Sequence, residues 1–210
     1  MEITVWVSLK NSMIWHDRKL VFIHIPKCGG TSVRKAIQKK LGGKHYNRTW
    51  LKGWKVETPQ EDGRLWNQHA TYDRYALTVP NDYMYIAQVR NPFDRFESMW
   101  KHMTRAKFTD VGFEKWGNDS IDALKVGDWQ SLFTIRQPGN ISDPSVLFKP
   151  QWHFVRDDVI IFKIEDKNIW NLLGLKETHL NTSPGKCEWS AKLFRKVQQF
   201  YERDFEQFRY

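Results

Sequence analysis

Three short apolar runs divide the chain, and each is followed by a helical pattern. The run Leu20 to Ile25 is almost unbroken and ends at Pro26, which is typical of a central strand buried on both faces of a parallel sheet. Tyr83 to Val89 repeats this pattern, and Val159 to Ile164 predicts a third buried strand. Three strand-to-helix units favour an α/β fold with a central, mostly parallel sheet.

Helical periodicity follows each predicted strand. After the first, a helix with one apolar face and a stop at Gly42 is indicated by Val33, Ala36, Ile37 and Leu41. After the second, Asn91 is placed as a helix cap and Pro92 as the first helical residue. The apolar stripe of that helix consists of Phe93, Phe96, Trp100 and Met103. Helices on both sides of a sheet predict a three-layer architecture.

The remaining segments predict shorter helices, loops and one closing helix. Ile169 to Leu175 has the apolar content of a short helix, and Ala191 to Phe208 predicts a helix that packs on the sheet. Two further helices are expected around 113–116 and 121–133. Surface loops are expected at 43–63 and 137–150, which are rich in Gly, Pro, Asn and basic residues. With 210 residues, the chain suffices for a single domain over 1–210.

Cysteine content, apolar runs and net charge restrict the cellular compartment and the class of binding partner that we expect. The two cysteines, Cys28 and Cys187, are too few for a disulfide framework and wrongly spaced for a four-ligand zinc site. No run approaches the roughly 18 apolar residues of a membrane span, and Met1 to Ser8 alternates apolar and polar residues, unlike a signal peptide. We therefore expect a cytoplasmic protein without a membrane span. A net charge of +9 indicates an anionic partner without identifying it.

The segment Pro26 to Ser32 combines the features of a phosphate-binding loop. Gly29 and Gly30 let the backbone approach a ligand, and amides at a helix N-terminus attract an anion. Side-chain donors come from Lys27, Thr31 and Ser32. An ordinary strand-to-helix turn needs neither a lysine, nor paired glycines, nor two adjacent hydroxyls. The loop is not a Walker A motif, which places its lysine after the last glycine.

A second cluster of donors follows the second predicted strand. Arg90 leaves the end of that strand, and Ser98 lies about two turns into the next helix. Ligands of open α/β sheets lie beyond the carboxyl ends of the strands, so Arg90 and Lys27 should face one crevice. The planar guanidinium suits a terminal phosphate. The alternative for Arg90 is a structural ion pair with a carboxylate such as Asp94.

Three segments together resemble a known family. In order along the chain they read VFIHIPKCGGTS, QVRNPFDRFES and FYERDFEQF. They are similar to the P-loop-like sulfotransferases that use 3′-phosphoadenosine 5′-phosphosulfate (PAPS), particularly the carbohydrate group that includes heparan sulfate 2-O-sulfotransferase. The resemblance spans residues 21–210. It implies transfer of a sulfuryl group to an acceptor hydroxyl, with release of adenosine 3′,5′-bisphosphate.

The resemblance also implies roles for individual residues. The first loop would bind the 5′-phosphosulfate through Lys27, Cys28, Gly29, Gly30, Thr31 and Ser32. Arg90 and Ser98 would bind the 3′-phosphate. The late segment Asn181 to Lys186 resembles a loop that folds over the 3′-phosphate and adenine, which implies donor contacts from Ser183 and Lys186. A common Ser-, Pro- and Gly-rich turn is the alternative for that segment.

A general base must also be found for the acceptor hydroxyl, and a histidine suits this role at neutral pH. The candidates are His16, His24, His45, His69, His102, His153 and His179. His69 lies between the two donor-binding units, where similar carbohydrate sulfotransferases place a catalytic histidine, and a packing histidine is the alternative. His24 lies within a predicted strand, which favours a structural role. Glu165, at the end of the third strand, is another candidate base.

The sequence does not identify the acceptor. A glycan hydroxyl fits the resemblance, while a small alcohol, a lipid or a protein side chain are alternatives, and the number of subunits is not predicted. Lys149 to Trp152 either shapes the acceptor side or is a loop around one buried Trp. We expect no nucleic-acid partner and no metal. Two other functions compete: a polyanion-binding module without catalysis, with basic residues spread along a face, and a kinase with an atypical loop that would need a carboxylate for Mg²⁺ near Thr31.

Overall fold

The computed structural model describes residues 14–15, 18–40, 69–77, 79–128, 130–133, 144–177 and 185–210. Its strands form one mixed sheet in the order β1-β2-β3-β4. They are β1 (Ile14–Trp15), β2 (Leu20–Ile23), β3 (Met84–Val89) and β4 (Ile160–Lys163). β3 is parallel to both β2 and β4, whereas the two-residue β1 is antiparallel to β2. The predicted mostly parallel sheet is confirmed, and β1 was not predicted.

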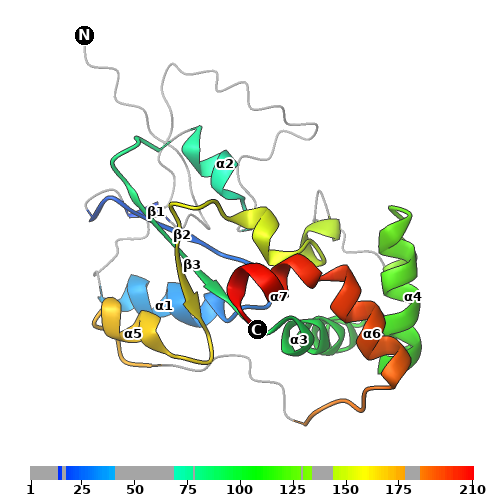
Figure 1. Cartoon of the computed structure of the whole chain (residues 1–210). Coiled ribbons are helices and arrows are strands. Elements are labelled where there is room, and N and C mark those ends of the chain that lie inside the picture. The colour runs from blue at the N-terminus through cyan, green and yellow to red at the C-terminus, as the bar shows by residue number, and fades with distance from the viewer. Residues whose placement is uncertain are drawn as a thin grey trace.

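Helices cover both faces of this sheet, with α1 (Gly30–Lys40) and α5 (Asn168–Leu172) on one side and α2 (Tyr72–Ala76) on the other (Figure 1). Successive side chains of a strand point to opposite faces, so neighbouring residues of β3 identify both layers. Met84 lines a cavity with residues of α1 and α5. The next residue, Tyr85, contacts the ring of Tyr72 in α2, with centroids 4.6 Å apart. The three-layer α/β prediction is confirmed.

A second group of helices packs beside the sheet. It consists of α3 (Pro92–Arg105), α4 (Phe113–Lys125), α6 (Ala191–Phe200) and α7 (Glu202–Phe208) (Figure 1). Phe96 of α3 is fully buried in this group and lies 5.2 Å from the ring of Trp116 in α4. The helix expected around 113–116 is the start of α4. Within the expected segment 121–133, α4 continues to Lys125 and a separate 3₁₀ helix covers Gln130–Leu132.

The single closing helix predicted for Ala191 to Phe208 is two helices, α6 and α7. The helix is interrupted between α6 and α7 at Tyr201, whose φ of −106° is not helical. The hydroxyl of the buried Tyr201 donates to the carbonyl of Phe148 at 2.9 Å, which anchors this break. α6 packs on α3 and α4. α7 packs against the 3₁₀ helix Gln151–Phe154.

The third predicted strand also differs from expectation. β4 is an edge strand, so its side chains are only partly covered and Ile160 is 44% exposed. The inner strands agree with prediction, because Val21, Ile23 and Val89 are fully buried. Residues 1–8, 42–63 and 137–143 of the sequence predictions lie outside the described residues, whereas Pro144–Leu147 forms a 3₁₀ helix. Among the described helices, none is long and apolar enough to cross a bilayer.

Candidate functional site

The predicted phosphate loop connects β2 to α1. Lys27 and Gly29 adopt left-handed backbone conformations, with φ of 66° and 75°, and α1 begins at Gly30. The first turn of α1 carries no acidic side chain. Because the amides of a first helical turn have no intrahelical acceptors four residues back, they point out of the helix toward the loop. Thr31 is partly exposed there and Ser32 is buried. The loop can thus present amides and a hydroxyl to an anion.

Close packing favours glycine at position 30, and the left-handed backbone favours it at position 29. A Cβ atom on Gly30 would lie 2.0 Å from Cδ2 of His24, whose ring is buried directly behind the helix start. A Cβ atom on Gly29 would lie 2.7 Å from Cδ1 of Ile164. Real Cβ atoms do not approach other heavy atoms so closely. The loop therefore sits tightly against the end of β2 and can hold its amides in place.

Lys27 is a partly buried cation surrounded by other cations. Burial, together with the nearby guanidinium groups of Arg105 and Arg90, lowers its pKa to about 8. The strongest effects of neighbouring charges on this pKa thus come from arginines. A site that concentrates positive charge in a partly desolvated position is suited to binding an anion.

Arg90 follows β3 and faces the same place. Its Nη1 atom lies 3.5 Å from the carbonyl oxygen of Lys27, at the limit of a hydrogen bond. The charge of Arg90 also helps to lower the pKa of Lys27, so the cations of the two strand ends lie near each other. Arg90 makes no ion pair with Asp94 among the described residues. Asn91 caps α3 as predicted, since its side-chain oxygen accepts from the amide of Phe93 at 2.9 Å.

One face of α3 borders this cluster. Ser98 lies in the second turn of α3 and is partly exposed. His102 and Arg105 follow it at spacings of four and seven residues, which places all three on one helical face. Burial lowers the pKa of His102 to about 4, and Lys27 and Arg105 act in the same direction. His102 was considered only as one of seven candidate bases, and Arg105 was not predicted as a site residue, although their spacing from Ser98 indicated a shared helical face.

His69 contacts the end of the strand that leads into the loop. Its Nδ1 atom lies 2.8 Å from the backbone oxygen of His24, and the two imidazole rings are 4.6 Å apart. Burial lowers the pKa of His69 to about 4, so the ring is neutral at pH 7. A carbonyl oxygen only accepts hydrogen bonds, so Nδ1 carries the proton and Nε2 keeps its lone pair. This tautomer is the one that a general base requires.

Two other candidate residues have structural contacts. His24 follows β2, is 4% exposed, and packs its ring against Gly30, and burial holds its pKa well below the usual value. Glu165 accepts from the amide of Asn91 and from the hydroxyl of Tyr210, both at 2.9 Å. These bonds tie β4 to the start of α3 and to the C-terminus. Glu165 is therefore a structural residue in this arrangement.

Arg95 is a buried arginine that donates a hydrogen bond to the backbone of the phosphate loop. It is fully buried in α3 and donates to three carbonyl oxygens, those of Pro26 at 3.0 Å, Leu147 at 3.3 Å and Lys149 at 2.9 Å. Its guanidinium thus joins the first residue of the phosphate loop to the segment before Gln151. The role of Arg95 could not be predicted from the sequence, because one arginine on a helix gives no local sign of burial.

The predicted late loop and acceptor segment are only partly supported. Ser183 lies outside the described residues, whereas Lys186 is exposed. Lys101 of α3 contacts both Glu97 and the carbonyl of Gly185, so this part of the loop lies beside α3. Of the two alternatives for 149–152, a loop around one buried Trp is wrong. Gln151 is the fully buried residue, and Trp152 is partly exposed under the guanidinium of Arg203, 3.9 Å from its ring centroid.

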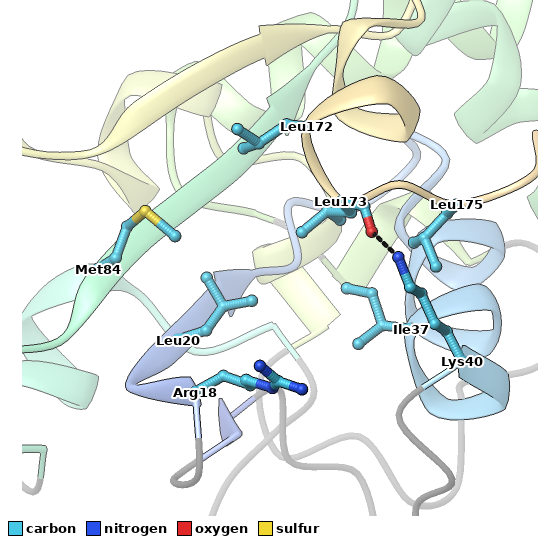
Figure 2. A pocket seen from close by; sticks show the side chains of 8 residues that line it. All are labelled: Arg18, Leu20, Ile37, Lys40, Met84, Leu172, Leu173 and Leu175. Atoms are coloured by element: carbon cyan, nitrogen blue, oxygen red, sulfur yellow. Dashed lines mark hydrogen bonds between the residues drawn. The ribbon is translucent and has the colours of Figure 1, made fainter.

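A cavity of about 310 Å³ lies elsewhere, between α1 and α5 (Figure 2). Leu20 and Met84, the first residues of β2 and β3, contribute to its lining. The phosphate loop and Arg90 instead follow the last residues of these parallel strands. The cavity is therefore at the opposite end of the strands from the phosphate loop. Within the residues that the structure covers, no group of His, Cys, Asp or Glu is arranged to hold a metal ion.

Comparison with known proteins places this geometry in a family. The structure is similar to the crystal structure of a sulfotransferase from Alicyclobacillus acidocaldarius. The alignment covers 90% of this chain and 92% of the other, at 16% sequence identity and a TM-score of 0.46. A search of curated proteins finds no match. The sulfotransferase family model matches residues 10–127, which include the phosphate loop, Arg90 and α3. Because this match covers more than half of its 210 residues, the chain belongs to the sulfotransferase family.

Proposed function

We propose that the protein transfers a sulfuryl group from PAPS to an acceptor hydroxyl, and that its two strand-end cations bind the two ends of this donor. The supporting observation is the distance of 3.5 Å between Nη1 of Arg90 and the carbonyl oxygen of Lys27. PAPS carries anionic groups at both the 5′ and 3′ positions of one nucleoside. Two adjacent cationic positions on separate loops fit such a molecule better than they fit a donor with a single phosphate chain.

Each group at the loop has a defined task in this proposal. The donor supplies an activated sulfuryl group, whose bond to the 5′-phosphate oxygen breaks as the acceptor oxygen attacks sulfur. Lys27 and the amides from Gly29 to Thr31 stabilise the charge that develops on the leaving oxygen. Arg90 and Ser98 bind the 3′-phosphate. A dianionic ligand beside Lys27 would raise its pKa again, which keeps the ammonium charged when it is needed.

The proton of the acceptor hydroxyl goes to Nε2 of His69. The bond from Nδ1 to the carbonyl of His24 fixes the ring and leaves Nε2 as the acceptor. The pKa of about 4 is low for a base, because burial disfavours the imidazolium form. Bound anionic donor would raise this pKa, since Lys27, whose charge contributes to the depression, would then be neutralised.

We further propose a carbohydrate hydroxyl as acceptor, in keeping with the carbohydrate group that the sequence motifs resemble. Residues 181–186 would fold over the 3′-phosphate with Ser183 and Lys186 as contacts. The contact between Lys101 and the carbonyl of Gly185 supports this, because it holds the loop beside the helix that carries Ser98. The guanidinium of Arg105 extends the positive surface from Lys27 along α3, whereas His102, with a pKa of about 4, is neutral at pH 7.

Calorimetry with adenosine 3′,5′-bisphosphate and with ATP tests the donor class. The wild-type protein should bind the bisphosphate more tightly than ATP, and Arg90→Ala should weaken the bisphosphate by about tenfold or more, the usual effect of losing a charged hydrogen bond. Lys125→Ala, an exposed change at the end of α4 that lowers the net charge by one as Arg90→Ala does, serves as the control for altered net charge. Tighter binding of ATP, or an unchanged Kd in Arg90→Ala, would contradict the proposal.

Transfer of radiolabelled sulfate from PAPS to a panel of glycans tests the chemistry. Lys27→Ala should leave folding intact and greatly reduce transfer. His69→Ala should lower turnover by about 10²-fold or more, as expected for loss of a general base, with little change in bisphosphate affinity. Full turnover in His69→Ala would remove this residue from the mechanism. Tight donor binding without transfer to any acceptor would instead favour a binding module.

A further inference from the structure

The side-chain amide of Gln151 connects the two proposed donor-binding loops. Gln151 is fully buried. Its Oε1 accepts from the backbone amide of Arg90 at 2.8 Å, and its Nε2 donates to the backbone oxygen of Arg90 at 2.9 Å. The same Oε1 also accepts from Sγ of Cys28 at 3.1 Å. One amide thus contacts both the residue that carries the guanidinium and a residue of the phosphate loop.

The position of Gln151 follows from the way in which the sheet opens. β2 pairs with β3 as far as Ala87, and β4 pairs with β3 as far as Val89. Beyond these pairs no strand partner is available for the N–H and C=O groups of Arg90, and buried backbone groups require partners. Gln151 supplies a donor and an acceptor from one planar group. It therefore continues the ladder at the point where the strands part and a crevice can form.

The thiol of Cys28 is suited to its part in this bridge. Burial raises the pKa of Cys28 to about 12, so the thiol keeps its proton at neutral pH and acts as a donor. Its acceptors are Oε1 of Gln151 and, at 3.6 Å, the carbonyl of Pro26. Cys28 immediately precedes the paired glycines. Movement of the Gln151 amide would therefore be transmitted directly to the phosphate loop.

Asp204 of α7 holds Gln151 in place. Its Oδ2 accepts from the backbone amide of Gln151 at 2.8 Å, and its Oδ1 accepts from the amide of Trp152 at 2.9 Å. Nε2 of Gln151 also lies 3.4 Å from Oδ2. Asp204 is completely buried. The C-terminal segment thus reaches the site through Gln151, although it contributes no donor-binding side chain of its own.

We propose that Gln151 is a positioning residue that sets the spacing between the phosphate loop and Arg90, so that the two anionic ends of one donor are bound at the same time. The inference rests on the proposed function. A residue that only stabilises the fold would affect every ligand of the site alike. A residue that sets the spacing affects a ligand with two anionic ends more than a ligand with one.

The test compares adenosine 3′,5′-bisphosphate with adenosine 5′-phosphate in calorimetry. Gln151→Met keeps the approximate shape and removes the hydrogen bonds of the amide. It should weaken the bisphosphate by about tenfold, corresponding to ~1.4 kcal/mol, and leave adenosine 5′-phosphate within about twofold of wild type. Tyr201→Phe is the matched control, because it removes a buried hydrogen bond to Phe148 from the same segment without touching the bridge. In Tyr201→Phe, the ratio of the Kd for adenosine 3′,5′-bisphosphate to the Kd for adenosine 5′-phosphate should equal that of the wild-type protein.

Equal weakening of both nucleotides in Gln151→Met, or the same change of ratio in Tyr201→Phe, would overturn the inference. If Gln151→Met does not fold, Cys28→Ala tests the loop side of the bridge alone and should weaken the bisphosphate selectively by a smaller factor. An unchanged ratio in Cys28→Ala would then overturn it. A wild-type protein that does not prefer the bisphosphate would reject the proposed function itself, and the inference with it.

Discussion

Replacement of Gly30 by alanine tests how tightly the phosphate loop is packed. Gly30 is the first residue of α1, where alanine would ordinarily stabilise a helix by up to about 1 kcal/mol relative to glycine. Its φ does not lie in the left-handed region, so backbone strain does not oppose the change. The added Cβ would, however, lie 2.0 Å from Cδ2 and 2.5 Å from Nε2 of His24. The His24 ring cannot turn away freely, because it is buried against the ring of His69.

Overpacking costs about 1–3 kcal/mol, and a contact of 2.0 Å belongs to the upper part of that range, about 2–3 kcal/mol. After the helical gain is subtracted, we expect a net destabilisation of roughly 1–2 kcal/mol, or a fall in Tm of about 2–8 °C for a chain of this size. Urea and thermal unfolding measure the change, and calorimetry with adenosine 3′,5′-bisphosphate measures the displacement of the loop. We expect weaker binding as well as lower stability, since the loop amides move together with Gly30.

Two other glycines provide controls for Gly30→Ala. Gly112→Ala adds a Cβ in open space at an ordinary φ of −60°, and it should change stability by no more than about 0.5 kcal/mol. Gly127→Ala also enters open space, but at a φ of +76°, and it reports backbone strain alone. A Gly30→Ala protein at least as stable as wild type, with unchanged nucleotide affinity, would refute the conclusion that His24 and the loop are packed in contact.

Three further predictions concern other groups of the site. Catalysis should require neutral His69 and charged Lys27, so kcat/KM plotted against pH should fall below about pH 4 and above about pH 8; an acid limb near 6.5 would contradict the burial of His69. At pH 8, iodoacetamide followed by mass spectrometry should modify the partly exposed Cys187 well before Cys28, whose pKa of about 12 and burial protect it until unfolding; equal rates would contradict this. Arg95→Ala removes a buried guanidinium that donates to three carbonyls and should cost at least about 3 kcal/mol in urea unfolding, whereas a loss below about 1 kcal/mol would show that these bonds are weak.

The parts of the fold that sequence predicted correctly have local causes. Apolar runs identified β2 and β3, and Asn91 with Pro92 identified the start of α3, because capping and burial on both faces leave marks within a few residues. The exposure of β4 was missed, since edge position depends on strand order. The break at Tyr201 was missed because its cause is a hydrogen bond to a carbonyl 53 residues away.

The same distinction applies to the site. The paired glycines and Lys27 were recognisable because one loop contains the whole phosphate-binding pattern. Gln151 was not recognisable, since its partners Arg90 and Cys28 lie 61 and 123 residues away in the sequence. His102 and Arg105 are an intermediate case. Their spacing from Ser98 indicated a shared helical face, but only the structure brings that face to Lys27.

The most direct test of the central claim is a crystal structure of the protein with adenosine 3′,5′-bisphosphate. The account predicts that the 5′-phosphate contacts the amides from Gly29 to Thr31 together with Lys27, and that the 3′-phosphate contacts Arg90 and Ser98. A nucleotide bound with only one phosphate in this crevice, or bound in the cavity between α1 and α5, would contradict it.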